Sequence, residues 1–214
     1  MQKILIAVPT YENIYPETFK SIYDLKSPGN TETDFLYFRG YDVANARNQI
    51  ATYMLDHNFD YVLMLDNDEV LPADGLINLL ETEQETCYDD NHNVIVGYTL
   101  QRSRKTDNKT KTTAFKIGEA YTFESAYTVD ELDKLLNSGM KHIIIRGSGL
   151  GHSLIHRSVF ERMKFPYYKW IVYENGQQLS EDLYFCEKVK NAKVKAQVIL
   201  DLRVRTGHIM RFQR

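Results

Sequence analysis

The sequence predicts an α/β fold with a mostly parallel central sheet flanked by helices. Short apolar runs of strand length alternate with segments whose apolar residues recur at helical spacing. Strands and helices that alternate along a chain fold through right-handed crossovers into a largely parallel sheet. The 214 residues, 43% of them hydrophobic, suffice for one core, and no internal repeat or low-complexity linker divides them. We therefore expect a single domain over residues 1–214.

The first hundred residues alternate strand and helix regularly. Residues 3–8 are almost wholly apolar, which suits a central strand covered on both faces. Asp42 is placed to cap the helix after the second strand, and Pro72 lies near the first turn of a later helix. The expected strands are 3–8, 35–38, 61–65 and 94–98, and the expected helices are 18–25, 42–55 and 72–80.

The second half of the chain is less regular. Residues 103–113 are polar and without periodicity, which predicts a surface loop. Thr128 and Glu131 form a capping box at the start of a helix that reaches Leu136. The remaining expected elements are a strand at 142–146, a glycine-rich turn at 147–151, helices at 158–163 and 179–190, and closing strands at 196–200 and 202–205.

Composition excludes several classes of protein. The formal net charge of −3 argues against a nucleic-acid binder that acts through overall charge. No run approaches the roughly 20 apolar residues of a membrane span, and the apolar run at the start is too short for a secretory signal. Cys87 and Cys186 show neither metal-ligand spacing nor a disulfide framework, so we expect a reduced, cytoplasmic protein.

Basic residues gather towards the end of the sequence. From Leu183 to Arg214, eight Lys and Arg stand against two acids, Glu187 and Asp201. This excess indicates either a solvated positive surface or a basic tail near an anionic ligand such as a diphosphate.

Asp66-Asn67-Asp68 is the strongest local signal for chemistry. These residues come directly after an apolar strand, and loops at the carboxyl ends of parallel strands are where open α/β sheets bind ligands. Two carboxylates separated by one residue can contact a ribose hydroxyl and a hard metal ion from one turn. The alternative is an ordinary Asn-Asp turn with no ligand.

Glu181, Asp182 and His208 are further candidates. Acids are favoured in the first turn of a helix, and Ser180 is a suitable N-cap, so the pair has a purely structural explanation. A carboxylate held rigidly at a helix start is also suited to act as a general base. His208 is either a surface histidine or an additional ligand to a metal held by the carboxylates.

Several other enzyme classes lack their motifs. The segment Gly147-Ser148-Gly149-Leu150-Gly151 does not have the spacing of a dinucleotide fingerprint, although it permits close approach of a substrate to the backbone. His152 and His156 are not part of an HExxH motif, and the residues between them predict a strand, which argues against zinc there. No Walker lysine motif or GxSxG elbow is present.

Taken in order, these segments resemble the GT-A glycosyltransferases, most closely the family 2 type. The resemblance spans nearly the whole chain, and Asp66-Asn67-Asp68 is similar to the family's DxD motif. The segments that carry it are Ile4-Leu5-Ile6-Ala7-Val8-Pro9-Thr10-Tyr11, Ala46-Arg47-Asn48, Asp66-Asn67-Asp68, Gly147-Ser148-Gly149-Leu150-Gly151, and Ser180-Glu181-Asp182-Leu183-Tyr184-Phe185 with Gly207-His208.

The resemblance implies a GT-A (nucleotide-diphospho-sugar transferase) fold and an inverting, metal-dependent enzyme of the hexosyltransferase type. Residues 1–100 would form a nucleotide-binding half and residues 101–214 an acceptor-side half. The donor would be a nucleotide-sugar, in the first instance a UDP-sugar, and the cofactor Mn²⁺ or Mg²⁺. The acceptor and the oligomeric state are left open.

The resemblance also implies roles for individual residues on the donor side. Asp66 would lie near the ribose, and Arg47 would contact the nucleotide or steady the acidic turn. Asp68 and His208 would bind the metal. The residues implied for nucleotide-sugar binding are Pro9, Thr10, Tyr11, Arg47, Asp66, Asn67 and Asp68.

On the acceptor side, the resemblance implies that Asp182 is the catalytic base. It would deprotonate an acceptor hydroxyl, which then attacks the anomeric carbon in one inverting displacement. Sugar rings stack well on indole, so Trp170 is a candidate for acceptor contact. The other residues implied on this side are Gly149, Gly151 and Glu181.

The chain departs from the family in two respects. Many family 2 members carry an acid for the uracil at the end of the second strand, whereas this strand ends in Phe38-Arg39-Gly40, so the base stays open. There is no membrane-spanning carboxyl region, which argues against a processive polysaccharide synthase and for a minimal catalytic domain.

Two alternative functions also stay open. One is a sugar-nucleotide nucleotidyltransferase, which is disfavoured because residues 9–16 contain neither glycine nor a basic residue. The other is a non-catalytic GT-A-like module that binds a nucleotide or a glycan.

Overall fold

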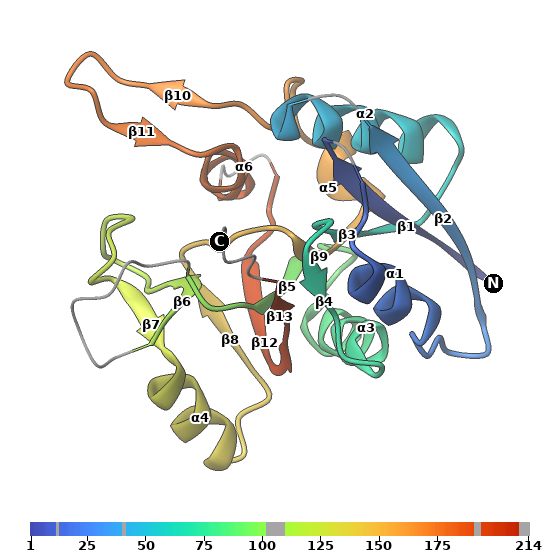
Figure 1. The fold of residues 1–214 in the computed structure, drawn as a ribbon, viewed down its shortest axis with the longest axis horizontal. Helices are drawn as coiled ribbons and strands as arrows, with labels where there is room; N and C mark the ends of the chain where they lie inside the picture. The colour runs from blue at the N-terminus through green and yellow to red at the C-terminus, as the bar shows by residue number, and fades with distance from the viewer. Residues whose placement is uncertain (12, 40–41, 102–109, 191–193, 210–214) are drawn as a thin grey trace.

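A seven-stranded sheet forms the centre of the computed structural model, which describes residues 1–11, 13–39, 42–101, 110–190 and 194–209 (Figure 1). The strand order is β2-β1-β3-β9-β5-β12-β8. The bounds are β1 Gln2–Thr10, β2 Thr31–Arg39, β3 Tyr61–Leu65, β9 His152–His156, β5 Val94–Tyr98, β12 Val198–Arg205 and β8 His142–Ile145.

Five of these seven strands run in one direction. β1 pairs in parallel with β2 and with β3, and β5 pairs in parallel with β12. β9 lies antiparallel between β3 and β5, and β8 closes the far edge antiparallel to β12. The predicted mostly parallel sheet flanked by helices is confirmed, and the carboxyl ends of the five parallel strands share one edge.

Helices cover both faces of the sheet. Successive side chains of β1 point to opposite faces of the sheet, and both faces are covered, which explains why its sequence is almost wholly apolar. Leu5 and Ala7 pack in one core cluster, and Ile4, Ile6 and Val8 pack in the other. The first cluster contains side chains of α2, α4, α5 and α6, and the second contains side chains of α1 and α3. The helices are α1 Pro16–Tyr23, α2 Val43–Asp56, α3 Gly75–Thr86, α4 Val129–Asn137, α5 Arg157–Glu161 and α6 Glu181–Val189. Among the described helices, none is long and apolar enough to cross a membrane.

The predicted helix caps are present. Asp42 accepts a hydrogen bond from the Asn45 backbone N–H at 3.0 Å, and Thr128 and Glu131 form the full capping box. Ser180 caps α6 by accepting from the backbone N–H of Leu183 at 3.4 Å. α3 starts at Gly75 instead of Pro72, because residues before it form a turn in which the Gly75 N–H donates to Pro72.

Some predicted elements differ from those observed. The polar segment predicted as a loop contains the start of β6, Lys111–Phe115, which pairs with β7, Ala126–Thr128; residues 102–109 lie outside the described part. Backbone pairing with β7 outweighs the polar composition there. Four further short strands were not expected: β4 (Glu69–Val70), which pairs with β13 (Gly207–His208), and β10 (Ile171–Val172), which pairs with β11 (Gln178–Leu179).

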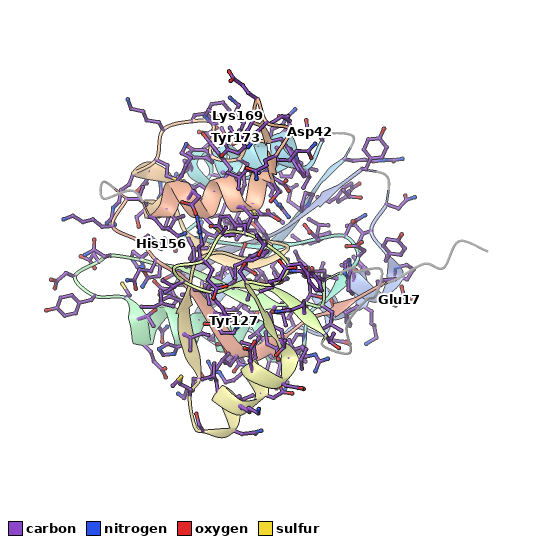
Figure 2. The ribbon with its side chains drawn as sticks, turned by 90° about the vertical axis from the view of Figure 1, so that its left-hand side faces the viewer. Glu17, Asp42, Tyr127, His156, Lys169 and Tyr173 are labelled. Atoms are coloured by element: carbon purple, nitrogen blue, oxygen red, sulfur yellow. The ribbon has the colours of Figure 1, made fainter. Side chains whose placement is uncertain are left out.

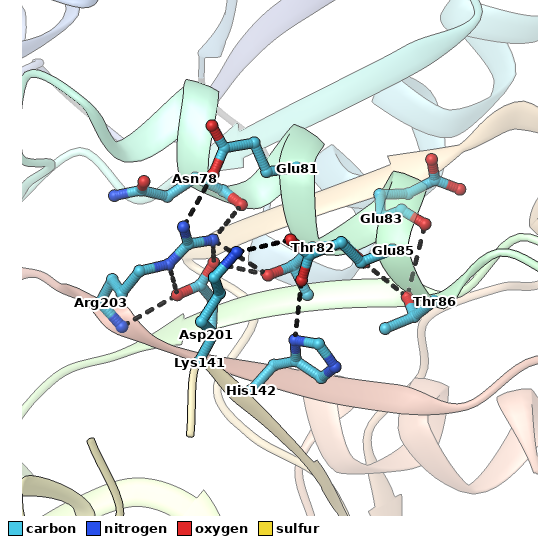
Figure 3. A network of polar contacts seen from close by, with 10 residues as sticks. All are labelled: Asn78, Glu81, Thr82, Glu83, Glu85, Thr86, Lys141, His142, Asp201 and Arg203. Atoms are coloured by element: carbon cyan, nitrogen blue, oxygen red, sulfur yellow. Dashed lines mark hydrogen bonds and ion pairs between the residues drawn. The ribbon is translucent and has the colours of Figure 1, made fainter. Parts of the chain in front are cut away.

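The two predicted closing strands are one continuous strand, β12. Asp201 lies in the middle of β12 and is fully buried, whereas the sequence predicts a break between two strands at this position. Figure 3 shows what compensates the buried carboxylate: Thr82 of α3 donates to it at 2.8 Å, and Arg203 pairs with it at 2.8 Å. Arg203 also pairs with Glu81 at 2.8 Å, so this network attaches α3 to the sheet.

Candidate functional site

A cavity of about 630 Å³ opens at the carboxyl ends of the parallel strands. It is bounded by the loop after β1, the acidic turn after β3, the loop after β5, the turn before β9, and the first turns of α2 and α6. Its lining residues are Pro9, Thr10, Tyr11, Asp42, Val43, Ala46, Asp66, Asn67, Asp68, Glu69, Thr99, Leu100, Gln101, Thr113, Gly149, Gly151, Asp182 and His208.

Backbone and side-chain hydrogen bonds fix the acidic turn. The Asp66 N–H donates to the Gly151 carbonyl at 2.8 Å, which ties the turn to the segment before β9. The Asn67 side-chain amide donates to the Asn13 carbonyl at 2.7 Å and to the Thr10 hydroxyl at 3.2 Å. A Cβ on Gly151 would lie 2.5 Å from the Asp66 Cγ, so only glycine lets these two segments approach this closely.

Arg47 of α2 lies beneath the cavity and binds three carboxylates. Its side chain is 1% exposed. Nη2 donates to Asp66 at 2.7 Å, and Nη1 donates to Glu181 at 2.8 Å and to Asp182. The guanidinium thereby joins the acidic turn after β3 to the start of α6, 135 residues further along the chain than Arg47. A planar guanidinium suits this multiple pairing because it presents several donors in a fixed geometry.

Burial raises the pKa of all three carboxyls against the opposing effect of Arg47. For Asp182, burial raises the pKa to about 7; Arg47 lowers it, and the neighbouring Glu181 and Asp66 raise it further. Burial likewise raises the pKa of Asp66 and of Glu181, and in both cases Arg47 acts in the opposite direction. Three acids share one cation, and their pKa values are raised. At least one of these carboxyls can therefore exchange a proton near neutral pH.

His208 reaches the acidic turn through a short strand pairing. β13 pairs antiparallel with β4, and the Ile209 N–H donates to the Asp68 carbonyl at 2.8 Å. This pairing places His208 Nε2 3.4 Å from Asp68 Oδ2, and both side chains line the cavity. Two ligands that share one ion at about 2.1 Å lie roughly 3.0–3.4 Å apart, so this carboxylate and imidazole fit a divalent cation.

A second histidine, His152, lies near the turn, and the sequence did not predict its pairing with Glu69. His152 of β9 is fully buried, and its Nδ1 lies 2.5 Å from Glu69 Oε2, to which the Thr206 hydroxyl also donates at 3.2 Å. Burial opposes protonation of His152, but Glu69, Asp66 and Asp182 raise its pKa. These two contacts attach β9 and the residue that follows β12 to Glu69, directly after the acidic turn. No spacing or motif in the sequence indicates them.

The structure brings most of the predicted site residues to one cavity and leaves three outside its lining. Arg47 and Glu181 are buried beneath the cavity, paired with each other. This position fits the expectation that Arg47 steadies the acidic turn. Trp170 is 48% exposed just before β10, and the cavity lining does not include it. The predicted residues that do line the cavity are Pro9, Thr10, Tyr11, Asp66, Asn67, Asp68, Gly149, Gly151, Asp182 and His208.

Sequence reasoning missed part of the lining. Thr99, Leu100 and Gln101 directly follow β5, so the rule that ligands bind at the carboxyl ends of parallel strands was sufficient to find them. Thr113 was assigned to a surface loop, and only the pairing of β6 with β7 brings it to the cavity.

Comparisons with known proteins give a structural match without a sequence match. No protein-family model matches the chain, and no curated protein sequence matches it. Among solved structures, A197 from STIV is similar over 99% of this chain and 87% of its own, with a TM-score of 0.62 and 16% identity. GalNAc-T7, solved with UDP, GalNAc and Mn²⁺, is similar over 100% of this chain with a TM-score of 0.62 and 11% identity; the match covers 45% of that protein. These likenesses show the fold alone: the chain has the GT-A glycosyltransferase fold.

Proposed function

We propose that this chain is a metal-dependent, inverting glycosyltransferase that transfers a sugar from a nucleotide-sugar to an acceptor hydroxyl. The observation that carries the proposal is the convergence of Asp66, Asp68, Asp182 and His208 on one cavity at the carboxyl ends of the parallel strands. These residues come from three separate regions of the sequence. Charged groups from distant segments meet at considerable energetic cost, which a ligand-binding role explains better than stability does.

The donor nucleotide would lie over the loop after β1. Pro9, Thr10 and the 74% exposed Tyr11 line this side of the cavity, and Tyr11 presents its aromatic ring and hydroxyl for a nucleobase and ribose. Asp66 keeps one oxygen on Arg47, and its side chain is 33% exposed, so it can also accept a hydrogen bond from a ribose hydroxyl. A UDP-sugar is the first donor to test.

Asp68 and His208 would hold the divalent cation, Mn²⁺ or Mg²⁺. When bound, the cation supplies positive charge that stabilises the departing nucleoside diphosphate. The backbone pairing of β13 with β4 fixes the imidazole against the carboxylate, so the chain itself sets this pair before any ligand binds.

Asp182 would act as the general base. It lies in the first turn of α6, with Ser180 as cap, and a carboxyl whose burial raises its pKa to about 7 is matched to proton transfer near neutral pH. The acceptor O–H bond breaks, and its proton passes to Asp182. The acceptor oxygen forms a bond to the anomeric carbon while the bond to the diphosphate oxygen breaks on the opposite face, which inverts the configuration.

The acceptor would approach from the side of Gly149 and Gly151. Gly149 lies close to both Thr113 and Asp182: a Cβ there would be 3.6 Å from the Thr113 Cβ and 3.9 Å from Asp182 Oδ2. Trp170 stays a candidate for acceptor contact through the β10–β11 pair. Glu181 is buried, so we assign it to supporting Arg47 and not to contacting the acceptor.

The test separates donor binding from transfer. We first measure thermal stabilisation by nucleoside diphosphates with and without Mn²⁺, and we expect a Mn²⁺-dependent shift with one base preferred. We then compare turnover of Asp182→Asn with that of Asp130→Asn, which changes an acid at the equivalent position of α4. Asp182→Asn should bind the diphosphate normally and lose transfer by about 10²–10⁴-fold, whereas Asp130→Asn should retain it.

Other outcomes would redirect the assignment. Normal transfer by Asp182→Asn rules out this base. Metal-dependent binding without transfer to a broad acceptor panel would favour a non-catalytic nucleotide-binding module. Pyrophosphate release from a nucleoside triphosphate and a sugar phosphate would favour a nucleotidyltransferase.

A further inference from the structure

A second group of potential metal ligands lies at the opposite edge of the sheet. The side-chain ligand atoms of Glu83, Cys87 and His92 all lie within 4.8 Å of one another. They lie beside the amino ends of β3 and β5 and the carboxyl end of β9. The acidic turn follows the other end of β3. Figure 2 shows His156, the last residue of β9, on the left and the cavity residue Asp42 towards the right.

The local backbone builds this cluster from one short segment. Glu83 lies in α3 and Cys87 caps its end, so the two side chains are four residues apart on one helix face. The chain then reverses in a tight turn, where Asp89 and Asp90 have φ values of 49° and 56° and Tyr88 bridges to Asn91. Two successive left-handed residues are typical of a type I′ turn. The turn returns His92 to Glu83 and Cys87.

The distances suit a tetrahedral metal site. His92 Nδ1 lies 3.6 Å from Cys87 Sγ. A zinc ion with Zn–S of about 2.3 Å and Zn–N of about 2.0–2.1 Å requires roughly 3.6 Å between these two atoms. Glu83 Oε1 lies 2.5 Å from the same nitrogen and needs to move outwards by about 0.8 Å to become a ligand.

Neighbouring side chains hold the three ligands in orientation. The Tyr61 hydroxyl donates to the second oxygen of Glu83 at 2.9 Å. The His92 ring stacks on His156 with ring centroids 3.4 Å apart, and the Ser158 backbone N–H donates to His156 Nδ1 at 3.2 Å. Such outer contacts commonly fix ligands at metal sites. Glu83 and His92 are 3% and 18% exposed in their side chains, so the cluster lies just beneath the surface.

We propose that Glu83, Cys87 and His92 bind one Zn²⁺, with water in the fourth position. Thiolate and imidazole favour zinc over Mn²⁺ or Mg²⁺, which prefer oxygen ligands such as those in the cavity. The inference is independent of the proposed transferase activity, because none of its residues lines the cavity. Zinc there would stabilise the turn between α3 and β5 and leave donor binding unchanged. Cys87 and His92 do not match a zinc motif, which explains why sequence spacing did not indicate the site.

Cobalt substitution tests the proposal directly. The full chain, first stripped of metal with a chelator, is titrated with Co²⁺ and followed by absorption. We expect a thiolate-to-metal charge-transfer band that saturates when one Co²⁺ occupies this cluster and that is abolished by Zn²⁺. Cys87→Ser should lose the band, and His92→Gln should weaken Zn²⁺ binding at least tenfold. His208→Ala, at the cavity, and the exposed His57→Gln should both keep the band.

Circular dichroism of each metal-free variant shows whether it remains folded. If the folded wild-type chain gives no thiolate band, or if Cys87→Ser binds Zn²⁺ as tightly as the wild type, the proposal is wrong. A band that persists in Cys87→Ser would assign the thiolate to the buried Cys186 and would also overturn it.

Discussion

The two edges of the central sheet hold polar groups in different ways. At the carboxyl edge, Asp66 and Asp182 share the buried Arg47 and face a cavity of about 630 Å³. At the amino edge, Glu83 and His92 pair with each other within a segment of ten residues. The first arrangement requires segments far apart in the sequence, whereas the second needs only one helix end and one turn.

Strand direction accounts for this difference. Parallel strands end together at the carboxyl edge, and the loops that follow them diverge, so a hollow forms that charged side chains can line. At the amino edge, the chain returns directly from α3 into β5 and closes over Glu83. Substitutions at the carboxyl edge should therefore change stability and transfer together, and substitutions at the amino edge should act locally.

The largest expected effect comes from removing the cation shared at the carboxyl edge. Arg47→Met leaves the buried Glu181 and the partly buried Asp66 and Asp182 without a counter-charge and should lower the free energy of unfolding by about 3–5 kcal/mol. Urea unfolding at pH 7 measures the loss. The loss in free energy of unfolding should be smaller at pH 5. Without the guanidinium the pKa of each carboxyl rises further, and protonation then removes the unpaired charge.

Arg157→Met is the matched control. Arg157 is partly exposed and pairs with the exposed Glu161 one helical turn away, so its loss should cost less than about 1 kcal/mol. Equal losses for the two variants would show that the carboxyl edge does not depend on its buried guanidinium.

The pH dependence of transfer gives the next largest effect. Asp182 must be ionised to accept a proton, and burial raises its pKa to about 7, so kcat/KM should fall about tenfold per pH unit below 7. The same raised pKa means that the folded chain holds this proton more tightly than the unfolded chain, so its contribution to stability declines as pH rises from about 4 to 7. A rate profile that stays flat from pH 5 to 7 would exclude Asp182 as the base.

Local signals made much of this fold predictable. The apolar run of β1, the cap at Asp42 and the capping box at Thr128 each depend on neighbours within a few residues, and all are observed. The placement of Asp66-Asn67-Asp68 after a buried strand likewise follows from local pattern and strand direction. Each of these features is determined by residues close together in the sequence.

The remaining features depend on contacts that no local pattern reports. The insertion of β9 between β3 and β5 is a property of the whole sheet. The pairing of Arg47 with Asp182 joins residues 135 positions apart, and the buried pair of His152 and Glu69 joins residues 83 apart. Asp201 stays inside β12 because Thr82, which comes from α3, and Arg203, two residues along the same strand, bind its carboxylate.

Two glycines at the carboxyl edge should respond differently to the same substitution. A Cβ on Gly151 would overlap the Asp66 carboxylate, so Gly151→Ala should displace the acidic turn and weaken diphosphate binding by about 1–3 kcal/mol. The nearest atoms to a Cβ on Gly149 are 3.6 Å away, an ordinary contact, so Gly149→Ala should bind normally. Calorimetry with a nucleoside diphosphate and Mn²⁺ compares them. Equal affinities would mean that Asp66 does not position the donor.

The smallest expected effect lies at the amino edge. Tyr61→Phe removes the hydroxyl that donates to Glu83, which should cost about 1 kcal/mol of stability in metal-free protein and weaken Zn²⁺ binding about tenfold. Tyr168→Phe is the control, since that buried hydroxyl donates to the Met64 sulfur, a weaker acceptor, at 3.5 Å. Because Tyr61 does not line the cavity, the Tyr61 variant should keep normal Mn²⁺-dependent diphosphate binding. Loss of that binding would show that the two edges are coupled through β3.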